Sequence, residues 1–111
     1  MKRSGKMEEV VIVSGARTAI GDFNGSLKGF SAVDLGVFAL KEALARINLA
    51  PELVEEVIAG QVYQAGCKGN PGRQVSMGAG CPVETVAATI NQQCASSMRA
   101  VEMISQEIML N

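Results

Sequence analysis

The 111-residue sequence contains no histidine, so it lacks a side chain that proteins commonly use to bind zinc. A zinc site would have to be built mainly from cysteine thiolates, and the sequence has only three cysteines. Cys67, Cys81 and Cys94 are an odd number without a C-x-x-C pair, so their spacing supports neither a zinc site nor a disulfide framework. We therefore expect three reduced thiols and no bound metal.

An excess of positive charge and long apolar runs are also missing. Ten basic residues stand against eleven acidic ones, and the formal net charge of −1 provides no basic surface for nucleic acid or an anionic membrane. No stretch approaches the ~20 apolar residues that span a bilayer, and no signal-peptide core follows the basic start of the chain. The sequence predicts a soluble, cytoplasmic protein. Its length and 48% hydrophobic content predict one small domain or part of one.

The order of predicted elements is an alternation of strands and helices. Short β-branched runs indicate strands, while Ser31 with Asp34 three residues later indicates the start of a helix that ends before Pro51. In chain order we expect a strand at 10–13, a helix after Ser31, a strand at 54–63, a short helix at 71–80, a strand at 84–91 and a helix from Cys94 onward. This βαβαβα order predicts an α/β fold with a mostly parallel sheet.

Several local patterns favour ordinary structural roles. The stretch "GCKGNPG", residues 66–72, lacks the spacing of a phosphate-binding loop and is predicted to be a turn-rich loop. Arg17 could meet a ligand phosphate, but a solvated or sheet-capping arginine is the preferred interpretation. The methionines at 98, 103 and 109 are predicted to fill the core. Cys67 and Cys81 are interpreted as small core or loop residues.

Cys94 occupies a position that favours chemistry. It follows a predicted strand and lies at or beside the start of a predicted helix, where unpaired backbone N–H groups and the helix dipole favour a thiolate. Ligand chemistry in parallel α/β sheets also gathers at the carboxyl ends of strands. From position alone, a reactive nucleophile and a buried, inert cysteine remain equally open.

The stretch "NQQCASSMRA", residues 91–100, resembles the thiolases, also called acetyl-CoA acetyltransferases. Their acyl-accepting cysteine lies in an N-x-x-C-x-S-small pattern at a helix start, and Asn91, Cys94, Ser96 and Ser97 match it in order. "VVIVSGARTAIGDFNGSLKGFSAVDLG", "GQVYQAG" and "NPGRQVSMGAG" extend the resemblance. It implies that Cys94 takes an acyl group from acyl-CoA as a thioester, with its backbone N–H as an oxyanion donor. Coenzyme A thioesters are then the substrates, and no separate cofactor is expected.

The resemblance also implies that part of the catalytic machinery lies elsewhere. In thiolases a histidine that activates the nucleophile and a second, acid–base cysteine come from the C-terminal half, and neither matches anything in this sequence. We therefore interpret residues 9–111 as a partial thiolase N-terminal domain after an extension at 1–8. A second chain carrying the remaining thiolase sequence is the expected partner, with further assembly into a dimer or tetramer.

Two alternatives from other classes of protein remain open. One is a redox-responsive thiol protein in which Cys94 reacts with oxidants and Cys67 or Cys81 acts as the resolving thiol. It requires an exposed Cys94 with another cysteine close to it. The other is a non-catalytic remnant that docks on a complete thiolase.

Overall fold

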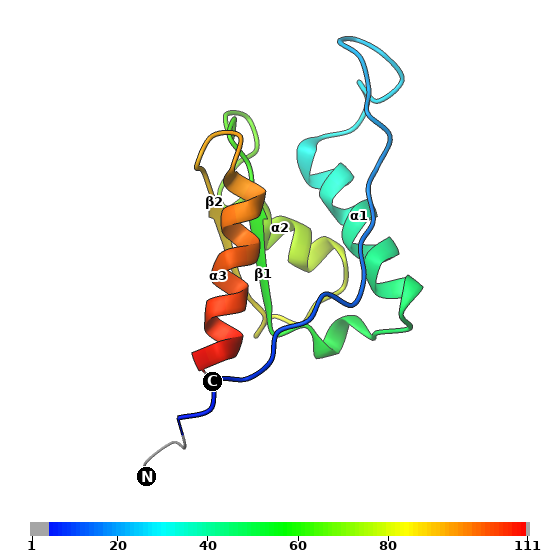
Figure 1. The fold of residues 1–111 in the computed structure, drawn as a ribbon. Helices are drawn as coiled ribbons and strands as arrows, with labels where there is room; N and C mark the ends of the chain where they lie inside the picture. The colour runs from blue at the N-terminus through cyan, green and yellow to red at the C-terminus, as the bar shows by residue number, and fades with distance from the viewer. Residues whose placement is uncertain (1–4, 111) are drawn as a thin grey trace.

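The computed structural model describes residues 5–110, which form an α/β fold with a small parallel sheet (Figure 1). Strand β1 pairs with strand β2 in parallel, in a register that runs from Glu56 opposite Val86 to Gly60 opposite Ile90. The elements are α1 (Ala32–Arg46), the 3₁₀ turn η1 (Pro51–Leu53), β1 (Glu56–Gly60), α2 (Pro71–Gly78), β2 (Val86–Ile90) and α3 (Ser96–Leu110). The α/β class and the parallel sheet are confirmed.

The start of α1 follows directly from its sequence. The Ser31 hydroxyl accepts a hydrogen bond from the Asp34 amide, and the Asp34 carboxylate accepts one from the Ser31 amide. These reciprocal bonds form a capping box that satisfies backbone donors at the helix start. The hydrogen bonds that the Ser31 backbone amide and then the Ser31 hydroxyl donate to the Asp34 carboxylate hold the pKa of that carboxyl below its ordinary value. The helix predicted after Ser31 is therefore confirmed.

The helices pack on the sheet unequally. Helices α2 and α3 contact both strands, whereas the main contacts of α1 are with α2. Gly72 permits the close approach of α2 to β2, because a Cβ atom there would lie 2.3 Å from the Ala88 carbonyl oxygen. The buried apolar side chains form a small core, made of Leu44, Val75, Ala79, Cys81 and Ala100.

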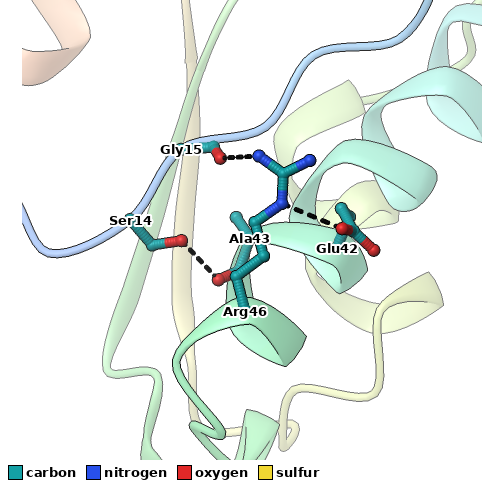
Figure 2. A network of polar contacts seen from close by, with 5 residues as sticks. All are labelled: Ser14, Gly15, Glu42, Ala43 and Arg46. Atoms are coloured by element: carbon teal, nitrogen blue, oxygen red, sulfur yellow. Dashed lines mark hydrogen bonds and ion pairs between the residues drawn. The ribbon is translucent and has the colours of Figure 1, made fainter.

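The strand predicted at residues 10–13 is wrong. This segment forms no helix or strand, and the Ile12 side chain is 85% exposed. The next residues are bonded to α1 (Figure 2): the Ser14 hydroxyl donates to the Ala43 carbonyl at 2.6 Å, and Arg46 donates to the Gly15 carbonyl at 2.7 Å. An apolar run becomes a strand only when its backbone pairs with a neighbouring strand, and residues 10–13 have no such pairing among the described residues.

The predicted core filling by methionines also needs correction. Met98 is 74% exposed and Met109 is 37% exposed, while Met103 is half-buried. Helix α3 packs on the sheet mainly through other positions, including the buried Ala100, so its first and last turns leave these long side chains outside.

A shallow apolar groove of about 350 Å³ runs between α3, β1 and the N-terminal segment. Val10, Val11 and Ile12 line one wall, Ile58 lies on β1, and the α3 side is formed by residues including Ile104 and Ile108. The apolar residues at 10–12 therefore lie beside the sheet without joining its hydrogen-bond ladder.

None of the helices between residues 5 and 110 has the length and apolar character needed to cross a membrane. The predicted extension at residues 1–8 lies partly outside the described residues, and its described part, 5–8, forms no helix or strand. The boundary between extension and domain stays a prediction.

Candidate active site

Cys94 lies in the short connection between the end of β2 and the start of α3, and its side chain is exposed. The sequence placed it at this junction, and the structure agrees. The other two thiols differ from it. Cys81 is buried, whereas Cys67 is half-buried in the loop after β1, where its sulfur accepts a hydrogen bond from the Gln61 side-chain amide at 3.2 Å. Cys94 is therefore the most accessible of the three free thiols.

The backbone beside Cys94 adopts an unusual conformation that side chains stabilise. Gln93 has a φ of 52°, in the left-handed region that non-glycine residues rarely occupy. The side-chain oxygen Oδ1 of Asn91 accepts a hydrogen bond from the Gln93 backbone amide at 3.1 Å, which closes a turn of the kind that Asn side chains often form. The Cys94 backbone is thus preceded by a turn with a defined geometry.

Ser96 closes the same turn from the helix side. Its hydroxyl accepts a hydrogen bond from the Gln92 amide at 2.9 Å and donates one to the Gln93 carbonyl at 2.6 Å. Ser96 is only 4% exposed, so both bonds are shielded from water. We call residues 91–96, with these side-chain bonds, the Cys94 turn.

The Cys94 turn is also fixed against β1. A Cβ atom on Gly60 would lie 2.4 Å from the Ser97 amide nitrogen, so only glycine lets the end of β1 and the start of α3 approach this closely. The Asn91 side-chain amide donates to the Val62 carbonyl at 3.3 Å, and the Gln61 amide donates to the Ile90 carbonyl at 3.0 Å. The carboxyl ends of both strands therefore meet at the same edge as Cys94, as Figure 1 shows for the loops that follow β1 and β2.

The loop after β1 is held by glutamine side chains. Gln61 donates to the Tyr63 carbonyl at 2.8 Å, and Gln64 donates back to the Gln61 carbonyl at 3.1 Å. Gln74, from α2, reaches the carbonyl oxygens of Cys67 and Gly69 at 2.6 and 2.8 Å. The predicted turn-rich loop at 66–72 is present up to residue 70, and residues 71 and 72 already belong to α2.

The two ends of α3 differ in their acidic side chains. Helix α3 has no acidic residue in its first turn, so nothing there offsets the positive end of the helix dipole. At the other end of α3, Glu107 lies against Glu56 of β1. The pKa of Glu56 is raised to about 7 there, mainly by a hydrogen bond with Glu107, and further by burial and by the negative charge of Glu107. Among the described residues, no cluster of three or more acidic or cysteine side chains could hold a metal ion.

Sequence reasoning placed Asn91 and Ser96 in a motif but missed what they do in the structure. An Asn two residues before a left-handed position is a local signal for such a turn and could have been used. The role of Gly60 had no such signal, because its contact with Ser97 joins positions 37 residues apart in the sequence. Arg17, a candidate for phosphate contact, is exposed.

Comparisons with known proteins agree with this arrangement. Residues 10–111 match the family model described as thiolase, N-terminal domain. An acetyl-CoA acetyltransferase from Clostridioides difficile is 51% identical over 94 residues, which cover 85% of this chain and 88% of the relative. One from Allochromatium vinosum is 48% identical over 101 residues, covering 91% of this chain and 26% of the relative.

Solved structures show the same fold. The crystal structure of Acat5 thiolase from Ascaris suum, in complex with coenzyme A, matches with a TM-score of 0.86 and 41% identity, over 88% of this chain and 26% of that one. Acetyl-CoA acetyltransferase from Syntrophomonas wolfei matches with a TM-score of 0.89 and 39% identity, over 95% of this chain and 26% of that one. The chain belongs to the thiolase family. It spans about a quarter of the Allochromatium vinosum relative, at 26%, and most of the Clostridioides difficile one, at 88%.

Proposed function

We propose that this chain carries the nucleophile of a thiolase and that Cys94 accepts an acyl group from acyl-CoA. The observation that carries the proposal is the exposed Cys94 thiol at the start of α3, beside the carboxyl ends of both strands. The names of the relatives, acetyl-CoA acetyltransferases, support an acetyl group as the acyl group. Thiolates attack thioesters readily, and exchange between two sulfur atoms changes the bond energy little.

The proposed reaction has two steps. In the first, the Cys94 sulfur attacks the thioester carbonyl of acetyl-CoA, a carbon–sulfur bond forms, and coenzyme A leaves as its thiolate and takes a proton. In the second, another acetyl-CoA loses an α-proton, and its carbanion attacks the Cys94 thioester. A carbon–carbon bond forms, the bond to Cys94 breaks, and acetoacetyl-CoA leaves; the reverse sequence is thiolysis.

The backbone N–H of Cys94 is the proposed oxyanion donor in the first step. It lies two residues before the first residue of α3, beside the helix start, where amide groups point out of the helix. Removing one donor of this kind typically costs ~2.7–4 kcal/mol of transition-state stabilisation. Side-chain bonds in the Cys94 turn hold the peptide that carries this N–H, through the Gln93 carbonyl, and the peptide before it, through the Gln93 amide.

The second step needs groups that this chain does not contain. The sequence has no histidine, and neither Cys67 nor the buried Cys81 lies in the Cys94 turn. We propose that the remaining thiolase sequence supplies the base and that the completed unit works as a dimer or tetramer in the cytoplasm. Because the activating histidine is also outside this chain, the isolated chain is expected to form the thioester only slowly, at a pH where a thiol ionises without that base, and to produce no acetoacetyl-CoA.

Acylation of the purified chain tests the proposal. The chain is incubated with acetyl-CoA at pH 8, where cysteine thiols ionise enough for exchange without an added base. Intact mass and peptide mapping should show one acetyl group, on Cys94. Cys67→Ala serves as the matched control and should be acetylated normally. Acetyl label on Cys67 or Cys81 with Cys94 unmodified would contradict the proposal.

A further inference from the structure

The Cys94 turn holds one side chain that bonds twice to the backbone just before Cys94. The Ser96 hydroxyl accepts a hydrogen bond from the Gln92 backbone amide at 2.9 Å and donates one to the Gln93 carbonyl at 2.6 Å. One hydroxyl, two residues after Cys94, therefore uses both its acceptor and its donor capacity on the two residues that precede Cys94.

The shielding of Ser96 gives these bonds their effect. A hydroxyl that is 4% exposed has little access to water, so its partners would also lose their bonds if it were removed. The two bonds stabilise the backbone at Gln93, whose φ of 52° lies in the left-handed region. Without the bonds, this residue would relax most readily out of that conformation. Relaxation at Gln93 would rotate the peptide that joins it to Cys94, and that peptide carries the Cys94 N–H.

We infer that Ser96 is a positioning residue that orients the Cys94 thiol and the Cys94 N–H for attack on a thioester. This inference rests on the proposed function, because it assigns Ser96 a part in thioester formation at Cys94. Ser96 acts through the backbone of Gln92 and Gln93 and does not touch the substrate.

Two reagents separate positioning from simple stability. Iodoacetamide needs only an accessible thiolate, whereas acetylation by acetyl-CoA also needs the thiol and the oxyanion donor to face one carbonyl group. In Ser96→Ala, acetylation of Cys94 should fall about tenfold or more, since misplacement by about 1 Å can cost 10²-fold. Alkylation of Cys94 by iodoacetamide should stay within about threefold of the unmodified chain, because it requires no oxyanion donor.

Two further variants keep the test decisive. Ser96→Thr retains the hydroxyl and should restore most of the acetylation rate. Thr85→Val removes another buried hydroxyl, 3% exposed, whose bond to the Val54 carbonyl at 2.7 Å lies before the start of β2, far along the sheet from Cys94. It should lower stability comparably to Ser96→Ala while leaving Cys94 acetylation unchanged. Protection of the buried Cys81 from iodoacetamide reports whether each variant remains folded.

The outcomes distinguish the two proposals. Normal acetylation of Cys94 in Ser96→Ala, with the unmodified chain also acetylated there, overturns the positioning role alone. Equal losses with both reagents, accompanied by alkylation of Cys81, also overturn it, because the effect is then general unfolding. Absence of acetylation at Cys94 in the unmodified chain overturns the proposed function itself. A selective loss of acetylation in Ser96→Ala, rescued by Ser96→Thr, supports the inference.

Discussion

The two ends of α3 are held to the sheet in opposite ways. At its start, Ser96 and Asn91 hold the Cys94 turn by hydrogen bonds, and Gly60 lets the backbone of β1 touch that of the helix. At its end, Glu107 faces Glu56 at the beginning of β1, and the last turn of the helix has no basic residue. The end that carries the thiol is fixed by contacts independent of pH, whereas the other end depends on a shared proton.

The largest expected effect is on chemistry at the fixed end. Cys94→Ser should abolish thioester formation, a loss on the order of 10²-fold or more, because an unactivated hydroxyl is a poor nucleophile at neutral pH. The fold should persist, since the side chain is exposed and such surface changes alter stability by about 0.5 kcal/mol or less. Mass spectrometry after incubation with acetyl-CoA measures the first effect and thermal unfolding the second. An acetyl adduct at full yield in Cys94→Ser would place the acceptor elsewhere.

The next largest effect is on the close contact that fixes this end. Gly60→Ala should destabilise the fold by about 1–3 kcal/mol, because the added Cβ atom would overlap the Ser97 backbone and force the helix start away from β1. Gly69→Ala is the control, since a Cβ there meets nothing within 4 Å. Urea unfolding compares the two variants. Equal stability of Gly60→Ala and Gly69→Ala would show that the helix start is not held by this contact.

A smaller effect is expected at the pH-dependent end. The pKa of Glu56 is raised to about 7 from 4.5, so the contact contributes its full stability below about pH 4.5 and loses it as pH rises through 7. Glu107→Gln removes the repulsion and should stabilise the chain at pH 8 by about 0.2–1 kcal/mol, the range of exposed charge pairs. At pH 5 it should change little.

Melting temperatures measured between pH 4.5 and 8 test this expectation, with Glu55→Gln, the exposed neighbour of Glu56, as the control. The slope of stability against pH should flatten only in Glu107→Gln. A slope unchanged in Glu107→Gln would mean that Glu56 and Glu107 do not share a proton.

The smallest effect is expected in the middle of α3. The Arg99 guanidinium lies 2.8 Å from the Glu102 carboxylate, and both side chains are substantially exposed. Exposed ion pairs of this kind contribute about 0.2–1 kcal/mol or less. Glu102→Gln should therefore shift urea unfolding by about 0.5 kcal/mol at most, without altering its pH dependence. A larger shift would show that this ion pair within the helix contributes more than its exposure allows.

The sequence predicted those features that depend on neighbouring residues. The helix after Ser31 was predicted from its cap, and the strands at 54–63 and 84–91 contain the observed β1 and β2, although each is shorter. The position of Cys94 between strand and helix was predicted from the same local pattern.

Features that depend on distant contacts could not be predicted. The apolar residues 10–13 have strand-like composition, but pairing is decided by where Ser14 and Gly15 bind on α1, 29 and 31 residues away. The helical spacing of Met98 suggested burial, yet whether a helix position is covered depends on what packs over it. The contact of Gly60 with Ser97 could not be predicted either, because it joins residues that are far apart in the sequence.

The Cys94 turn is encoded within six consecutive residues, and this has a consequence for folding. Contacts between close neighbours in sequence form in about 10–100 ns, whereas pairing β1 with β2 must bring together residues 30 apart, such as Glu56 and Val86. We expect the turn to form early and the parallel strands to pair late. The geometry around the thiol would then be established before the sheet that supports it, and folding rates of Ser96→Ala and Gly60→Ala, measured by stopped flow, would order the two events.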